Sequence, residues 1–225
     1  VRNVAQIAIV GLGALVLLNT LGISITPILT TLGIGGLAVA LGLQETLANL
    51  FAGMHMTLAG NIRVGDVIRL ESGDEGHVDD VHWRATRVRT FANNFVLIPN
   101  SRLAQSVVTN YNFPSKEVVV AVQVGVHYAS DLERVETVAC EVGRAVMKTV
   151  EGGVVDFEPM VRFHTFGESR IECTVSLRAR EYTDAGAIKH AFMKALSHRF
   201  AAEGIVMPLP IRAINLDQEK ARPLT

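Results

Sequence analysis

Charged side chains are almost missing from the beginning of this sequence. From Val1 to Gln44 the only charged residue is Arg2, and the first acidic residue is Glu45. A long stretch without charge indicates a membrane setting, because lipid tolerates few charged side chains and water favours them. Beyond Asn61 acidic and basic residues are mixed as in ordinary soluble proteins, and hydrophobic residues make up 49% of the whole chain.

Two other scarcities exclude function classes. Cys140 and Cys173 are the only cysteines among 225 residues, which excludes a disulfide framework and predicts two reduced, buried thiols. The formal net charge of -1 provides no excess of basic residues for a phosphate backbone. We therefore expect no nucleic-acid partner.

The sequence matches the motifs of catalytic and metal-binding sites only poorly. The segment IVGLG at 9–13 resembles the start of a dinucleotide-binding loop, but valine stands where that loop needs a small residue and no acid follows at the right distance. No Ser, His and Asp are arranged as a triad. The histidines lack metal spacing, and the pairs considered are His77 with His82 and His190 with His198. We expect no metal, no cofactor and no catalytic residue, and we do not expect an enzyme.

Two apolar segments can be proposed as membrane helices. Val4 to Leu18 is apolar except for one glutamine, but it is shorter than the roughly 20 residues of a full span. Thr26 to Leu43 is the second segment, with Thr26 as the expected cap and Pro27 at the first helical position. Asn19 to Ile25 is the expected turn between them.

The short first segment and the missing initiating methionine predict that the chain is part of a longer protein, whose first helix begins before Val1. A signal peptide over residues 1–20 is the alternative. Arg2, Arg63 and Arg69 predict that both ends lie on the positive, cytoplasmic side. We therefore expect a multi-pass protein of the inner (plasma) membrane with its C-terminal region in the cytoplasm.

The second apolar segment has an unusual pattern on a helical wheel of about 100° per residue. One face carries Leu37, Leu41 and Gln44. The two flanks of this face carry small residues, which are Gly33, Gly36 and Ala40 on one side and Ala38 and Gly42 on the other. Small flanks let two neighbouring backbones approach closely, as in a closed ring of identical helices. Leucines that point at the axis of such a ring form a hydrophobic constriction, which gates water and ions by dewetting. The alternative is that Leu37 and Leu41 face lipid or belong to a core and form no constriction.

The pattern changes after this segment. An apolar stripe at helical spacing follows, made of Leu47, Leu50, Phe51, Met54 and Leu58. We expect the helix to continue in a new direction near the membrane boundary, with a kink at Gly53. A straight helix with the stripe as plain core is the alternative.

Short strands and turns fill residues 61–113 and predict a small β-barrel (Sm-like) domain. RNA binding by this barrel is a weaker alternative, since no aromatic platform is evident. Residues 114–225 read as β-α-β-β-α-β, the ferredoxin-like split βαβ order, ending in a short strand at Ile211–Leu216. The fold class is therefore a membrane α-helical segment over residues 1–60, whose pore helix spans about 27–58, followed by an α+β cytoplasmic region.

Four motifs in order carry a family resemblance over nearly all of the chain. They are GLAVALGLQETLANLFAG (Gly36–Gly53), RVGDVIRL (Arg63–Leu70), FVLIPNSRL (Phe95–Leu103) and GIVMPLP (Gly204–Pro210). With them the sequence resembles the pore helix and cytoplasmic region of the small-conductance mechanosensitive channel family, the MscS-like channels. The resemblance implies a homoheptamer with a central pore, a barrel layer below the membrane and a hollow cytoplasmic cage with side openings.

The resemblance also implies roles for residues. Leu37 and Leu41 match the two leucine rings that close the pore, and the small residues of the flanks match the packing positions of the family. One departure is Glu45, which stands where a glycine commonly follows the position of Gln44. It moves the expected hinge to Gly53 and places Gln44 and Glu45 at the pore mouth.

We predict a mechanosensitive ion channel that membrane tension opens and that releases ions and small solutes under hypo-osmotic stress. Its expected partners are copies of itself, membrane lipids and the permeating solutes. A non-conducting, membrane-anchored scaffold is the alternative. A membrane-bound enzyme is a third possibility, for which the sequence shows no catalytic site.

Overall fold

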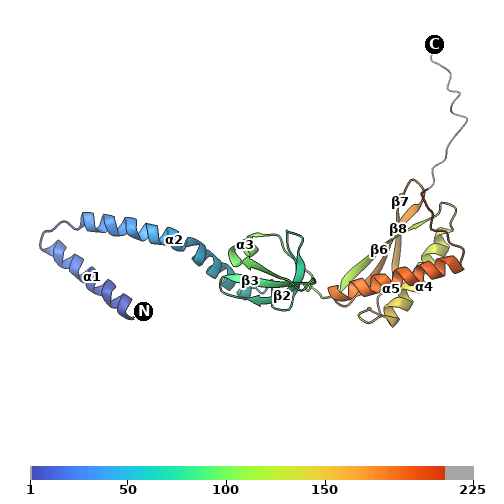
Figure 1. Ribbon diagram of the computed structural model, residues 1–225, viewed down its shortest axis with the longest axis horizontal. Helices are drawn as coiled ribbons and strands as arrows, with labels where there is room; N and C mark the ends of the chain where they lie inside the picture. Colours follow the sequence, from blue (N-terminus) through green and yellow to red (C-terminus); the bar gives the residue numbers. More distant parts are fainter. Residues whose placement is uncertain (1, 211–225) are drawn as a thin grey trace, which may run out of the picture. The chain divides into compact units, whose positions relative to one another are not determined.

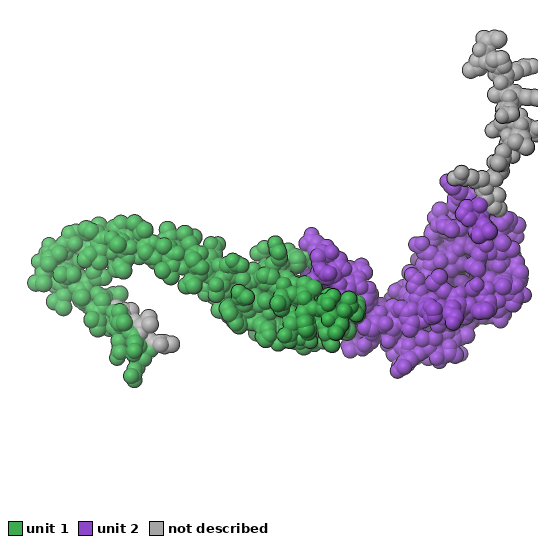
Figure 2. Space-filling view, viewed as in Figure 1, with its two compact units in different colours: residues 1–65, 77–107 green, residues 66–76, 108–225 purple. Residues whose placement is uncertain are grey.

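The computed structural model describes residues 2–210. The chain divides into two compact units, which are residues 1–65 with 77–107 and residues 66–76 with 108–225 (Figure 2). The predicted strand at Ile211–Leu216 lies outside the described residues, as does the end of the expected third domain.

Two helices begin the first unit (Figure 1). α1 spans Arg2–Thr20 and α2 spans Thr26–Ala59. By length and composition α2 can cross a membrane, whereas the apolar part of α1 is shorter. The prediction of Thr26 as the cap of α2 was wrong: Ile25 holds that position without a side-chain cap, and Thr26 is already helical, with its carbonyl accepting from the Thr30 hydroxyl. Pro27 is the second helical residue, one position later than expected, and it is tolerated because the first turn needs no N–H from it.

Five strands form the sheet that follows. They are β1 (Val67–Arg69), β2 (Glu75–Val81), β3 (Ala85–Thr90), β4 (Phe95–Pro99) and β5 (Thr109–Asn110). Their order in the sheet is β4-β3-β2-β1-β5. A turn at 93–94 joins β3 to β4, and Asn93 adopts a positive φ of 63° there, which asparagine tolerates better than most residues. The strands match the prediction for residues 61–113, and closure of this sheet into a barrel stays a prediction.

A short helix, α3 (Asn100–Gln105), lies between β4 and β5 and was not predicted. For residues 61–113 the sequence predicted short strands and turns. Pro99 in fact holds the N-cap position of α3, and Asn100 and Leu103 are buried.

The second unit contains the C-terminal α/β domain. Its elements are β6 (Val118–Val126), α4 (Leu132–Thr149), β7 (Met160–Phe166), β8 (Ile171–Ala179), the 3-10 turn η1 (Tyr182–Asp184) and α5 (Ala185–Ala202). The strand order is β6-β8-β7, and β8 is antiparallel to both neighbours. β6 and β7 therefore run parallel with β8 between them, which is the predicted split βαβ arrangement.

Alternation along β8 explains the core of this domain. Every second residue from Ile171 to Ala179 is buried, and the residues between them are half-buried. The buried side of the sheet packs with apolar faces of α4 and α5, including Val138 and Phe192. Cys140 and Cys173 are both buried and free, as the sequence predicts.

Candidate functional site: the apolar helix α2

The first half of α2 is exposed throughout. An 18-residue apolar stretch of this helix has no buried residue. Leu37 and Leu41 are 61% and 62% exposed, although leucine is normally among the most buried residues. Within the described part of the chain, no other element covers this apolar half of α2.

The small-residue flanks are equally open. A β-carbon placed on Gly33, Gly36 or Gly42 would meet no atom within 4 Å outside the local helix. Ala38 and Ala40 are exposed as well. The glycines in this half of the helix are therefore not required by packing inside the single chain, and their reason must lie in something that approaches the helix from outside.

The second half of α2 packs on its own domain through a face that is not its apolar stripe. Asn49, Gly53 and Met56 are the buried residues of the helix, at a spacing of i, i+4 and i+7. The apolar stripe that the sequence singled out remains 41–79% exposed, at Leu47, Leu50, Phe51, Met54 and Leu58. The alternative that this stripe is plain core was therefore wrong for the single chain.

Two asparagines build the attachment. The side chain of Asn49 accepts from the backbone N–H of Ser101 at 2.9 Å and donates to the carbonyl of Glu45 at 2.9 Å. Asn100 is fully buried; it donates to the carbonyl of His82 at 2.8 Å and accepts from the Thr86 hydroxyl at 2.9 Å. A buried amide with satisfied groups holds one orientation, because every alternative leaves a polar atom unpaired.

Gly53 lies against this network. A β-carbon at Gly53 would come within 2.4 Å of the Asn100 side-chain nitrogen and 3.3 Å of the Trp83 carbonyl. The position therefore needs glycine for close packing. Figure 1 draws α2 as one helix that bends along its length, and its hydrogen-bonded turns continue past Gly53. A hinge at Gly53 stays a prediction.

Gln44 and Glu45 lie between the two halves. Both side chains are exposed, and the helix is continuous through residues 44–46. An open cavity of about 750 Å³ lies on the Gly42–Asn49 side of the helix, where Glu45, Arg84 and Trp83 are among its lining residues. Glu45 is thus exposed one turn after Leu41, at the end of the apolar half of α2.

Asn100 and helix α3 are the parts of this site that the sequence reasoning missed. The motif FVLIPNSRL contains both, yet nothing in its composition distinguishes a buried asparagine from a turn asparagine. No group of three or more His, Cys, Asp or Glu residues between 2 and 210 could hold a metal ion. The chemistry available on α2 is therefore that of an apolar surface with one carboxylate at its end.

Two family models match the chain. Residues 45–113 match the mechanosensitive ion channel β-domain, and residues 120–207 match the C-terminal domain of the mechanosensitive ion channel MscS. The chain belongs to the MscS family of mechanosensitive channels. The two matched MscS domains correspond to the five-stranded sheet and the split βαβ domain, so the predicted family and fold class are confirmed.

Relatives extend the match to the N-terminal helices. The small-conductance mechanosensitive channel MscMJ of Methanocaldococcus jannaschii is 30% identical over 97% of this chain and 61% of that protein. A small-conductance mechanosensitive channel of Helicobacter pylori is 27% identical over 98% of this chain and 79% of that protein. The crystal structure of Helicobacter pylori MscS in its closed state matches 95% of this chain and 82% of that chain, with a TM-score of 0.76 and 25% identity.

The chain covers part of several MscS relatives. Besides 61% of MscMJ, it spans 45% of the large-conductance mechanosensitive channel MscMJLR of the same organism. The family is one of membrane channels, and α2 is the described helix that is long and apolar enough to cross a bilayer.

Proposed function

We propose that this chain forms the pore and the cytoplasmic region of a homo-oligomeric ion channel, a homoheptamer, that opens under membrane tension. Open, it releases ions and small solutes when the cell meets hypo-osmotic stress. In this proposal the protein is a multi-pass protein of the inner (plasma) membrane, and the domains after α2 lie in the cytoplasm. One observation carries it: the first half of α2 is apolar and wholly exposed, while its second half is anchored to the chain's own domain.

The gate in this proposal is the leucine face of α2. Leu37 and Leu41 lie one turn apart and are among the large side chains between the two small flanks. In a ring of α2 helices they meet around the axis, and hydrating an apolar side chain costs about 1.5–3 kcal/mol relative to burying it. A narrow ring of such groups stays dry and blocks ions.

The flanks supply the packing between subunits. Gly33, Gly36 and Ala40 of one helix lie against Ala38 or Gly42 of the next, which brings the backbones close without side-chain gaps. Tension favours the state that occupies more membrane area, so tilting and rotation of the helices moves the leucines off the axis. Gly53 is the proposed hinge for that movement, and Gln44 and Glu45 form the pore mouth.

Patch recording under suction tests this function. The full-length protein in liposomes should give discrete currents at a reproducible tension, and Leu41→Ser should lower the threshold or leak at rest, since a hydroxyl wets the constriction. Val39→Ser is the matched control, because Val39 is as exposed as Leu41 but lies off the leucine face. A wild-type protein without currents would favour a non-conducting scaffold, and an unchanged threshold for Leu41→Ser would remove the gate assignment.

A further inference from the structure

Four side chains of the second unit form a closed set of contacts, which we name the tyrosine clasp. Its members are Arg69 at the end of β1, Glu75 at the start of β2, Tyr111 just after β5 and Tyr182 in η1. Arg69, Glu75 and Tyr111 belong to the matched β-domain, and Tyr182 belongs to the matched C-terminal domain. The clasp therefore joins two family domains by side chains.

The contacts of the clasp are specific. The Tyr182 hydroxyl donates to Oε2 of Glu75 at 2.6 Å, and the other oxygen of Glu75 accepts from the Arg69 guanidinium. The rings of Tyr111 and Tyr182 are stacked, with 3.9 Å between centroids and 15° between planes. The Arg69 guanidinium carbon lies 5.7 Å from the Tyr111 ring centre.

Both tyrosines and Glu75 are half-buried, so water competes only partly for these bonds. Burial in the first place, and the bond to Glu75 in the second, raise the pKa of Tyr182. Its hydroxyl therefore stays protonated and able to donate at neutral pH.

The clasp is separate from the core of the C-terminal domain. The buried apolar cluster of that domain is built from β6, β7, β8, α4 and α5, and it includes neither tyrosine. The chain connection between the two domains is residues 111–117. In this segment the Asn112 side chain accepts from the Val67 N–H, and two exposed ion pairs lie at its end, Lys116 with Glu181 and Glu117 with Arg178. Exposed ion pairs of this kind contribute little to the free energy of folding. The clasp therefore links the two domains by side chains that are not part of the core of the C-terminal domain.

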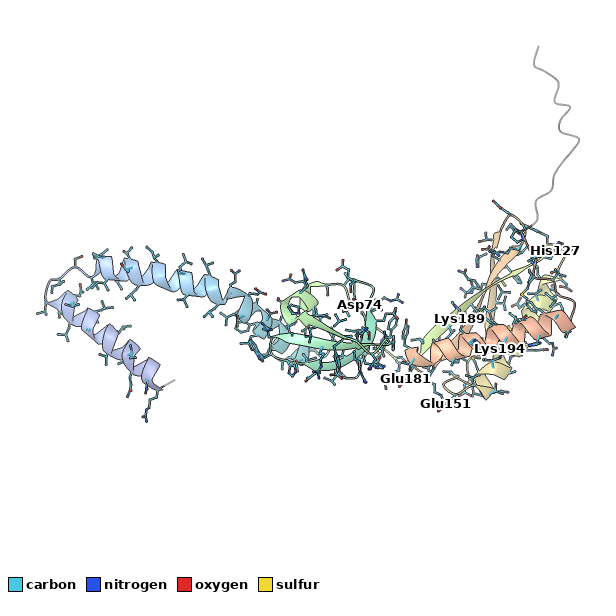
Figure 3. The ribbon with its side chains drawn as sticks, viewed as in Figure 1. Asp74, His127, Glu151, Glu181, Lys189 and Lys194 are labelled. Atoms are coloured by element: carbon cyan, nitrogen blue, oxygen red, sulfur yellow. The ribbon has the colours of Figure 1, made fainter. Side chains whose placement is uncertain are left out.

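We propose that the tyrosine clasp is a releasable latch, which fixes the C-terminal domain on the β1–β5 edge and, when open, lets the domain move about residues 111–117. Closed, it holds the C-terminal domain to the residues of β1, β2 and β5 within its own unit; open, it turns the connection into a joint. The inference does not depend on the gate or on ion conduction. Figure 3 labels Asp74 and Glu181, the chain neighbours of Glu75 and Tyr182.

Hydrogen exchange of the purified full chain, read by mass spectrometry, tests the latch. Tyr182→Phe keeps the ring but loses the hydroxyl, and it should raise exchange in residues 111–117 at least threefold while the amides of β8 exchange as in the wild type. Tyr128→Phe is the matched control: its hydroxyl donates to the Gly167 carbonyl outside the clasp, so residues 111–117 should not respond.

A double variant shows whether the hydroxyl and the carboxylate act together. Glu75→Ala should raise exchange in residues 111–117, and adding Tyr182→Phe should raise it no further, because the shared bond is already gone. Three results would overturn the latch: unchanged exchange in both Tyr182→Phe and Tyr182→Ala, independent effects of the two substitutions, or an equal rise in β8, which would mean that the clasp merely supports the fold.

Discussion

The backbone N–H of Ser101 donates to the side-chain oxygen of Asn49 over 2.9 Å, and this bond ties α2 to a helix 52 residues further along the chain. Asn49 is 3% exposed, so the bond is shielded from water. It lies next to the fully buried Asn100, which is bonded to His82 and Thr86 and lies against Gly53 of α2, so the two asparagines hold the second half of α2 on its own domain.

Replacing Asn49 by alanine should destabilise the fold of this domain. The Ser101 N–H loses its acceptor in a buried place, which costs about 1–3 kcal/mol. Thermal unfolding of the purified protein measures the effect. Thr46→Ala is the control, since Thr46 is exposed one turn earlier on the same helix and should change stability by no more than about 0.5 kcal/mol. Equal melting temperatures for the two variants would show that the bond contributes nothing.

Gly53→Ala separates a packing role from a hinge role. Alanine favours a helix over glycine by about 1 kcal/mol, so a position without contacts should gain stability. At Gly53 the added carbon meets the Asn100 amide, which is fixed by two hydrogen bonds, and we expect a net loss of stability. The matched variant Gly42→Ala meets nothing within 4 Å. A Gly53→Ala protein that melts no lower than wild type, but gates abnormally, would favour the hinge alone.

Valine on the small flanks should alter the gating of the assembled channel without affecting membrane insertion of the single chain. Gly36→Val and Ala40→Val add bulk where two helices meet in the proposed ring, which costs about 1–3 kcal/mol per site in a tightly packed interface. Membrane insertion should be unchanged and the tension threshold altered. Patch recording and a membrane-fraction assay together read out both effects. Wild-type gating by both variants would mean that the helices do not pack through these flanks.

Glu45→Gln tests the pore mouth. A ring of carboxylates, one from each subunit, attracts cations and repels anions near the mouth. In a salt gradient the variant should shift the reversal potential toward anion preference. Glu71→Gln, an exposed acid outside the helix, should leave it unchanged. If the reversal potential of Glu45→Gln also stays at the wild-type value, Glu45 is a helix-stabilising surface residue.

Acid should weaken the contact between α4 and α5. The Arg134 guanidinium first, with Arg199 as a further partner, lowers the pKa of Glu203 below its usual value. A lowered pKa in the folded state stabilises the fold above the unfolded value of about 4.3, and this contribution disappears as pH falls through the folded pKa. Glu203→Gln should therefore melt below wild type at neutral pH, with the difference vanishing in strong acid. A difference that is constant with pH would contradict the assignment.

The C-terminal domain was predictable because its signals are local. Alternating apolar residues mark β8, and Asp131, a residue type favoured at helix starts, caps α4 by accepting from the N–H groups of Glu133 and Arg134. Gly204 follows α5 with a positive φ of 69°, a conformation that glycine favours after a helix.

The attachment of α2 was not predictable in the same way. Sequence patterns locate contact faces by their apolar residues, and the contact face here consists of an asparagine, a glycine and a methionine. The larger apolar stripe beside it is exposed. Asn100 is buried because its amide satisfies groups brought from His82 and Thr86, a tertiary relationship that no local pattern contains. The gate and the flanks depend on neighbouring copies and remain proposals.

The division of α2 into an open and an anchored half has an evolutionary consequence. The 18-residue apolar stretch of the open half has no buried residue. In the proposed channel, substitutions there change the lipid-facing or pore-facing surface without a stability penalty for the domains, so selection acts on them through gating and assembly and not through folding of the domains. Changes at Asn49 or Gly53 meet a folding requirement first, whereas changes at the leucine face and the small flanks meet only the requirements of the proposed gate and subunit packing.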